Sequence, residues 1–234
     1  MNDNERKQPQ IFISSEAHSW SVYTFWLKDN RLLEIKFSFD LNYTMLKIIG
    51  KLILQLSGWK IVDKTPLGIN KYPKAVIIAV PHTSNWDYPY AMATLYAMGC
   101  KIRYLAKDSL FKFPLGMIIR GLGGIPVNRS QKNNLVQMMT DLLVNAPEMQ
   151  LLVPAEGTRS YTSEWKSGFY HIAKNAGVPI VLGFLDFGKK EAGFLGVFQP
   201  SGNYEEDLPK IQSFYKNITP KHPEYFSLKD AKLD

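Results

Sequence analysis

Short apolar runs alternate with longer amphipathic stretches along most of the chain. Ala75–Val80 is an unbroken apolar run, rich in β-branched residues, that stops at Pro81. A run of this kind predicts a buried strand of a parallel sheet. Similar runs predict further strands at Lys101–Ala106, Ile125–Val127, Met149–Val153, Val178–Phe184 and Gly193–Phe198. Helices are predicted between and after them at Tyr88–Met98, Asn133–Ala146, Trp165–Gly177 and Tyr204–Ile218. We therefore expect a single α/β domain with a mixed, mostly parallel central sheet flanked by helices.

Met45–Leu56 predicts an amphipathic helix that precedes this domain core. Lys47 and Lys51 lie four residues apart on one face, and apolar residues fill most of the rest. At about 1.5 Å per residue the helix reaches about 18 Å, whereas the hydrocarbon core of a bilayer is roughly 30 Å thick. The helix is too short to span a membrane. It either lies on a membrane surface or packs in the core with a solvated lysine edge.

The two ends of the chain carry weaker patterns. Residues 1–44 show no clean periodicity and no signal-peptide pattern. We expect them to form a poorly ordered N-terminal extension, with a strand at Ser21–Trp26 as the alternative. The predicted domain covers residues 45–225, and residues 226–234 are predicted to be a tail.

The net charge of +7 is unevenly placed. Residues 1–44 contain five basic and six acidic residues, so the remainder carries +8. A basic body favours anionic partners, such as phosphorylated small molecules or an anionic membrane surface. No pattern typical of a nucleic-acid-binding module is found, so we expect no nucleic-acid partner.

Cys100 is the single cysteine of the chain. One cysteine excludes an internal disulfide and a cysteine-based metal cluster, and it suits a reducing compartment. Because Cys100 follows Gly99 near a predicted helix end, we expect a small packed residue rather than a nucleophile.

The first candidate site follows the strand predicted at Ala75–Val80. His82 comes almost directly after it, and Asp87 follows five residues later. Ligands of open α/β sheets bind beyond the carboxyl ends of strands, where a histidine and a carboxylate can act as a general base and its orienting partner. The alternative is a helix N-terminus with Ser84 as N-cap and Asp87 in the first turn. Capping does not explain His82.

Two further candidates also follow predicted strands. Gly157 permits close backbone approach, and Thr158, Arg159 and Ser160 supply donors for a phosphate or an oxyanion. Glu156 is expected to orient Arg159 or to accept a hydrogen bond from a substrate hydroxyl. The alternative is a polar turn with a local ion pair between Glu156 and Arg159.

Arg129 follows the strand at Ile125–Val127 and is a candidate phosphate clamp. On its own it would be taken for a surface residue. Between these segments, Leu110–Ile119 is apolar and is interrupted by Pro114 and Gly116. We expect it to be partly exposed and to contact a partner, a lipid or a hydrophobic ligand.

Together these residues match four motifs in order and at the expected spacing, over about residues 45–225. The chain resembles the lysophospholipid acyltransferases of the 1-acylglycerol-3-phosphate acyltransferase superfamily. Its sequence PHTSNWD is similar to the motif of a bacterial branch of that family. His82 and Asp87 match the family's H-x4-D motif. The other three blocks are Gly124–Arg129, Glu156–Ser160 and Val178–Val181.

Two positions depart from the family pattern. Ala155 stands directly before Glu156, where the family usually has proline, and Asn128 stands before Arg129, where the family often has aspartate. Neither change touches a proposed catalytic atom, although Asn128 bears on acceptor preference.

The resemblance implies transfer of a fatty acyl group from acyl-CoA or acyl-carrier protein to the hydroxyl of a lysophospholipid, with 1-acylglycerol-3-phosphate as the expected acceptor. His82 would act as base and Asp87 would orient it. The residues expected to hold the acceptor are Arg129, Glu156, Gly157, Thr158 and Arg159. No metal or bound cofactor is implied, and the protein would work as a peripheral protein on the cytoplasmic face of the cell membrane.

Two alternatives stay open. One is a non-catalytic, peripheral lipid-binding relative, and the intact His82/Asp87 pair argues against it. The other is a hydrolase that uses the same pair. The chain has no G-x-S-x-G elbow and no clear set of metal ligands to support that function.

Overall fold

The computed structural model describes residues 21–26, 32–37, 43–127 and 135–228. The chain divides into two units, Met1–Leu41 and Asn42–Asp234. In the first unit, β1 (Ser21–Trp26) and β2 (Leu32–Phe37) form an antiparallel pair. Ser21–Trp26 is therefore a strand, which was one of the two expected outcomes, whereas β2 was not predicted.

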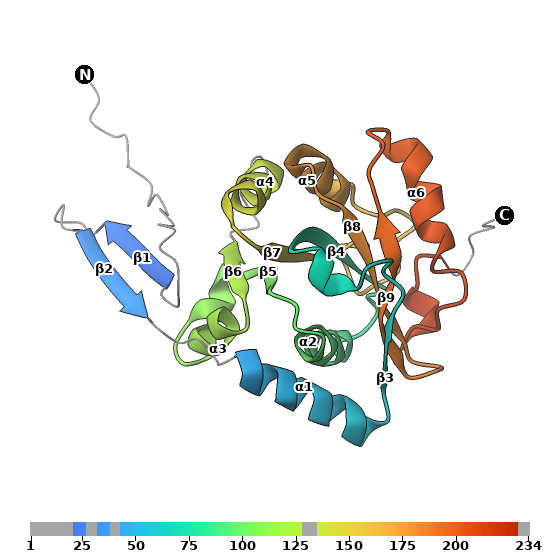
Figure 1. Ribbon diagram of the computed structural model, residues 1–234, viewed down its shortest axis with the longest axis horizontal. Helices are drawn as coiled ribbons and strands as arrows, with labels where there is room; N and C mark the ends of the chain where they lie inside the picture. Colours follow the sequence, from blue (N-terminus) through green and yellow to red (C-terminus); the bar gives the residue numbers. More distant parts are fainter. Residues whose placement is uncertain (1–20, 27–31, 38–42, 128–134, 229–234) are drawn as a thin grey trace. The chain divides into compact units, whose positions relative to one another are not determined.

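The second unit contains a seven-stranded sheet, which confirms the predicted α/β class (Figure 1). The strands, in their order across the sheet, are β3 (Lys60–Asp63), β9 (Glu191–Phe198), β8 (Ile180–Asp186), β4 (Lys74–Val80), β7 (Met149–Pro154), β5 (Ile102–Lys107) and β6 (Gly124–Val127). The five strands from β8 to β6 are parallel to one another. β9 pairs antiparallel with β8, and β3 pairs parallel with β9.

Helices cover both faces of this sheet (Figure 1). On one face, α4 (Leu135–Asn145), α5 (Gly168–Ala176) and α6 (Tyr204–Ser213) contribute to the main hydrophobic core. On the other face lies α2 (Asp87–Ala97). Successive residues of β4 point to opposite faces, and Ala75, Val76, Ile77 and Ile78 are all fully buried. The unbroken apolar run of β4 thus reflects its place between two helical layers.

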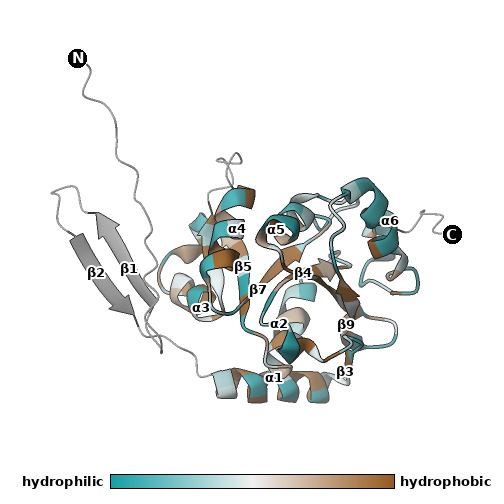
Figure 2. Cartoon of the chain, turned by 45° about the horizontal axis from the view of Figure 1, so that its top comes forward, coloured by the Kyte–Doolittle hydropathy of each residue, from teal (hydrophilic) through white to brown (hydrophobic). Residues whose placement is uncertain are grey.

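The helix α1 (Tyr43–Ser57) packs against α2 and presents two apolar faces. Leu46, Gly50 and Leu54 recur every four residues and are the buried residues of α1. A Cβ on Gly50 would lie 2.4 Å from the carbonyl oxygen of Ala93, so the two helix backbones are in close contact. Six other apolar residues are 42 to 79% exposed, namely Met45, Ile48, Ile49, Leu52, Ile53 and Leu56. Figure 2 shows α1 at the bottom edge of the domain.

The short helix α3 (Leu115–Gly121) and the turn before it confirm the predicted exposed apolar segment. Leu110, Leu115 and Ile118 are each more than two fifths exposed, and Phe113 is 85% exposed. Within the part of the chain that the structure describes, no helix is both long and apolar enough to cross a membrane.

The domain continues beyond residue 225, where the sequence had predicted its end. Phe226 and Leu228 are buried and belong to the main hydrophobic core. Cys100 is also buried, and this burial, with a smaller contribution from the charge of Asp63, raises the pKa of its thiol to about 12. The structure thus agrees with Cys100 as a packed residue and not as a nucleophile.

Gly50→Ala is expected to destabilise the domain, because the new methyl group meets the backbone of α2. We expect the free energy of unfolding to fall by about 1–3 kcal/mol, as in other overpacked cores. Gly168→Ala is the matched control, since the nearest atom to a Cβ there is 4.0 Å away. Urea denaturation of both variants checks this, and equal stabilities would contradict the close contact.

Candidate active site

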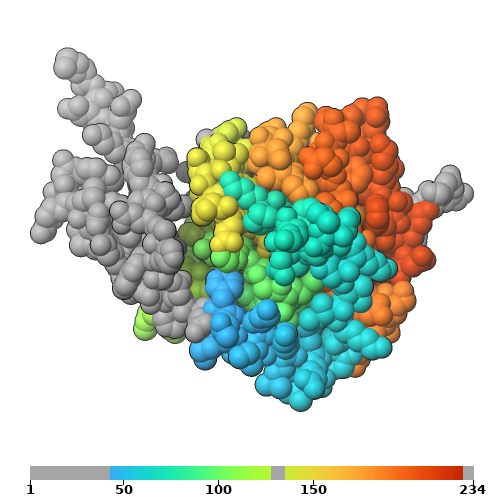
Figure 3. All heavy atoms as spheres, in the orientation of Figure 1, coloured from blue at the N-terminus to red at the C-terminus, as the bar shows by residue number. Residues whose placement is uncertain are grey.

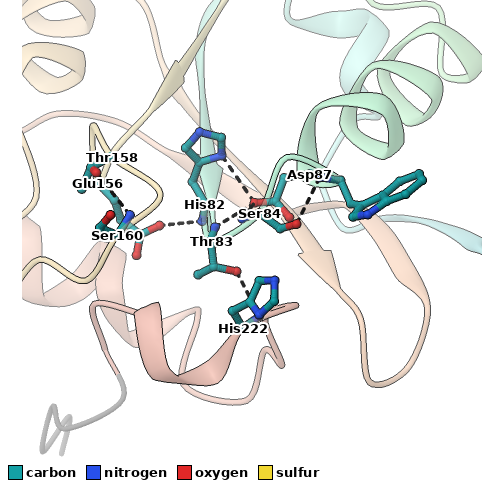
Figure 4. Close-up of polar contacts among 9 residues, drawn as sticks. His82, Thr83, Ser84, Asp87, Glu156, Thr158, Ser160 and His222 are labelled. Atoms are coloured by element: carbon teal, nitrogen blue, oxygen red, sulfur yellow. Dashed lines mark hydrogen bonds and ion pairs between the residues drawn. The ribbon is translucent and has the colours of Figure 1, made fainter.

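His82 lies on the loop that joins the central strand β4 to α2, and Asp87 is the first residue of α2 (Figure 4). His82 Nδ1 is 3.5 Å from Asp87 Oδ2, and the two side chains are 16% and 5% exposed, respectively. Because Nδ1 faces the carboxylate, Nε2 on the other side of the ring is the nitrogen that can meet a substrate. This is the arrangement expected of a general base and its orienting group.

Asp87 has a second role in this loop. Its Oδ2 atom accepts hydrogen bonds from the backbone N–H groups of Thr83, at 2.7 Å, and Ser84, at 2.8 Å. Ser84 is not the predicted N-cap, because α2 begins after Trp86 and Ser84 Oγ accepts the Trp86 N–H instead, at 3.1 Å. Holding the loop and orienting His82 are therefore not alternatives, since one carboxylate does both.

Glu156 lies next to His82 because β7 pairs with β4, with Ala79 opposite Pro154. Its side chain is buried at 1% exposure. Oε2 accepts the backbone N–H of His82 at 2.5 Å, and Oε1 accepts the backbone N–H of Ser227 at 3.1 Å. The expectation that Glu156 orients Arg159 is wrong, because no ion pair joins them in the described ranges and the carboxylate holds two backbone N–H groups instead. A contact with a substrate hydroxyl stays a prediction.

The residues after Glu156 turn outward. Gly157 has a φ of +69°, and a Cβ there would lie 2.9 Å from Lys166 Cγ, so this position requires glycine. Thr158, Arg159 and Ser160 are exposed. Arg159 forms no ion pair with any residue in the described ranges, Glu156 included, so its guanidinium is available to an anion.

Two residues that sequence reasoning missed also lie at this site. Lys166 packs its aliphatic chain beside Gly157, and the backbone N–H of His222 donates to Thr83 Oγ1 at 3.2 Å. Neither lies in a recognisable motif, so no local pattern points to it.

Arg129 lies outside the described residues, and its role stays a prediction. In the described ranges, no three His, Cys, Asp or Glu side chains are grouped so that they could hold a metal ion.

Comparison with known proteins agrees with this geometry. Residues 67–181 match the family model Acyltransferase, and this segment includes His82, Asp87 and Glu156–Arg159. The fold is similar to the crystal structure of the 1-acyl-sn-glycerophosphate (LPA) acyltransferase PlsC from Thermotoga maritima, with a TM-score of 0.52 and 18% identity over 76% of this chain and 81% of that chain. The chain therefore contains an acyltransferase domain. No curated protein matches this acyltransferase at the level of sequence.

Substitutions of His82 and Asp87 separate the two roles of the carboxylate. His82→Ala is expected to lower acyl transfer by about 10²–10⁴-fold, the usual contribution of a general base, with little effect on stability. Asp87→Ala is expected to lose activity and also to destabilise the domain by about 1–3 kcal/mol for each backbone N–H left unpaired. Acyl-transfer assays and urea denaturation measure both effects.

Asp87→Asn is the matched variant. Its amide oxygen can accept the N–H groups of Thr83 and Ser84, so most of the stability should return while the negative charge beside His82 is lost. Full activity in folded Asp87→Asn would show that Asp87 only holds the loop.

Proposed function

We propose that this acyltransferase moves a fatty acyl group from a thioester donor, acyl-CoA or acyl-carrier protein, to the free hydroxyl of a lysophospholipid. The expected acceptor is 1-acylglycerol-3-phosphate, and the reaction would serve phospholipid biosynthesis or remodelling. The observation that carries the proposal is the His82–Asp87 pair at the carboxyl end of the central strand β4. The exposed Arg159, which forms no ion pair within the described part of the chain, follows the neighbouring strand β7.

In the proposed reaction, His82 Nε2 takes the proton of the acceptor hydroxyl while the hydroxyl oxygen attacks the carbonyl carbon of the thioester. The Asp87 carboxylate near Nδ1 stabilises the imidazolium that forms. The tetrahedral intermediate then breaks its C–S bond, and the departing thiolate recovers the proton from His82. The products are an ester and a free thiol, and no residue serves as a covalent nucleophile.

The acceptor's phosphate would bind where the chain turns outward after β7. The guanidinium of Arg159 is suited to bidentate contact with phosphate, and Gly157 lets the backbone approach closely. Thr158 adds a hydroxyl, and Arg129 is proposed as a second cationic contact. Glu156 is left out of this set because its carboxylate is buried and binds two backbone N–H groups.

Both the acceptor and the acylated product of such a reaction reside in a bilayer. We propose that the protein docks peripherally on the cytoplasmic face of the membrane through the exposed apolar residues of α1 and of the Leu110–Ile118 segment. Lys47 and Lys51 are also exposed on α1. Basic residues near an anionic surface each add about 1 kcal/mol, a contribution that salt screens.

The central test incubates the purified protein with acyl-CoA or acyl-carrier protein and mixed lysolipids, and mass spectrometry identifies the products. Arg159→Ala is expected to raise KM for a phosphorylated acceptor by about 10–100-fold, the equivalent of one charge-assisted hydrogen bond, and to leave KM for the donor nearly unchanged.

Lys174→Ala is the control, since Lys174 lies near the end of α5 and bonds Gly202 O away from the motif residues. Release of free fatty acid without ester formation would assign the pair to a hydrolase. Equal changes in both KM values for Arg159→Ala would contradict the proposed acceptor site.

Membrane docking is tested by liposome flotation. Phe113→Asp should weaken binding to neutral and anionic vesicles, because the lost contact is apolar. Lys47→Glu with Lys51→Glu should weaken binding mainly to anionic vesicles at low salt. Phe214→Asp is the control, since Phe214 is an exposed aromatic residue that follows α6 on the other face of the sheet. Wild-type protein that fails to float with anionic vesicles at low salt would refute the docking.

A further inference from the structure

The C-terminal segment, defined here as Thr219–Leu228, lies against the loop that carries His82. It follows α6 and lies outside the part of the chain that matches the acyltransferase family model. Thr219 O accepts the backbone N–H of Phe187 at 2.8 Å, which fixes the start of the segment. Phe226 and Leu228 are buried in the core and fix its end. Figure 3 shows the C-terminal surface in red beside the teal surface of residues near the end of β4.

Two backbone N–H groups of this segment reach the active-site loop. His222 donates to Thr83 Oγ1 at 3.2 Å, and Ser227 donates to Glu156 Oε1 at 3.1 Å (Figure 4 shows the first). The Ser227 side chain is fixed in turn, because its Oγ accepts the indole N–H of Trp165 at 2.8 Å. The segment therefore binds Thr83, the residue after His82, and Glu156, whose carboxylate binds the His82 backbone.

Glu156 links the segment to His82 through one buried group. Its two oxygens each accept one backbone N–H, from His82 and from Ser227, and no cation in the described ranges pairs with it. A buried carboxylate is tolerated only when hydrogen bonds replace its lost hydration. Removing the Ser227 N–H would leave half of the carboxylate unsatisfied, so the carboxylate and the His82 backbone that it holds would have to rearrange.

The loop itself is held by carboxylates on two sides. The N–H of His82 binds Glu156, whereas the N–H groups of Thr83 and Ser84 bind Asp87. The 3.5 Å approach of His82 Nδ1 to Asp87 depends on where this loop sits between them. A displacement of about 1 Å from reactive geometry can lower a rate about 10²-fold, so the anchors of the loop bear directly on catalysis.

We propose that the C-terminal segment is a positioning element of the active site. It acts on His82 through Glu156 and Thr83, and Glu156 is accordingly a positioning residue that does not touch the acceptor. The inference rests on the proposed function, since it concerns the geometry of the same catalytic pair.

The test removes single backbone or side-chain contacts and measures kcat separately from KM. Ser227→Pro deletes the N–H that binds Glu156, and Glu156→Gln keeps the shape of the side chain but places an amide donor against one of the two N–H groups. Both are expected to lower kcat by about 10–100-fold, with KM for donor and acceptor changed by less than about threefold.

Trp165→Phe is the control for Ser227→Pro. It removes the bond to Ser227 Oγ and leaves the Ser227 N–H in place, so stability should fall while kcat stays near the wild-type value. Hydrogen exchange gives a readout that does not need activity. The amides of His82, Thr83 and Ser84 should lose protection in Ser227→Pro and keep it in Trp165→Phe.

A second pair of variants decides the matter if Ser227→Pro does not fold. Thr83→Val removes the acceptor of the His222 N–H and should lower kcat, whereas Thr83→Ser keeps the hydroxyl and should restore it. Unchanged kcat in Thr83→Val and Glu156→Gln would contradict the positioning role and show that the segment only stabilises the fold. If Glu156→Gln raised KM for the acceptor alone, Glu156 would be an acceptor-binding residue and not a positioning residue. An inactive wild-type protein whose exchange pattern still responds as expected would overturn the proposed function and not the positioning role.

Discussion

The pairing of β4 with β7 is the constraint on which the active site depends. Because the two strands are parallel neighbours, their carboxyl ends lie at one edge of the sheet, and the residues that follow them meet although 74 positions separate His82 from Glu156. β4 and the first half of β7 are largely buried, so the packing of their apolar side chains disfavours a shift of register. The hydrophobic core thereby fixes the distance between the two motifs, and the polar contacts only refine it.

Two buried carboxylates complete this arrangement. Asp87 and Glu156 each accept two backbone N–H groups, so the loop between β4 and α2 is organised by charges that the fold has taken out of water. A buried carboxylate strongly destabilises the folded state when it has no hydrogen-bond partner. With its partners in place, it holds the surrounding backbone rigidly. The same bonds that make these carboxylates tolerable hold the histidine ring beside its partner, so local stability and catalytic geometry have a common origin.

Much of this architecture was predictable from local pattern. The buried strands around β4 and the helices α2, α4 and α5 follow from apolar runs and periodicity, and His82 and Asp87 were found by their place after a strand. Local pattern did not predict three other features: the strand β3, the burial of Phe226 and Leu228, and the contacts of His222 and Ser227. Each of them depends on neighbours distant in sequence. Glu156 was assigned the wrong partner for a related reason. Arg159 is near it in sequence, but the chain turns at Gly157, which directs Glu156 inward and leaves Arg159 at the surface.

The close contact at Gly50 places the helix with the exposed apolar residues directly on the helix that leads to the active site. Because a glycine faces the Ala93 carbonyl, the backbones of α1 and α2 can approach each other closely. α1 offers apolar side chains to the outside, and α2 begins at Asp87, the residue that faces His82. The outer apolar surface and the carboxylate beside His82 thus belong to two helices in direct backbone contact.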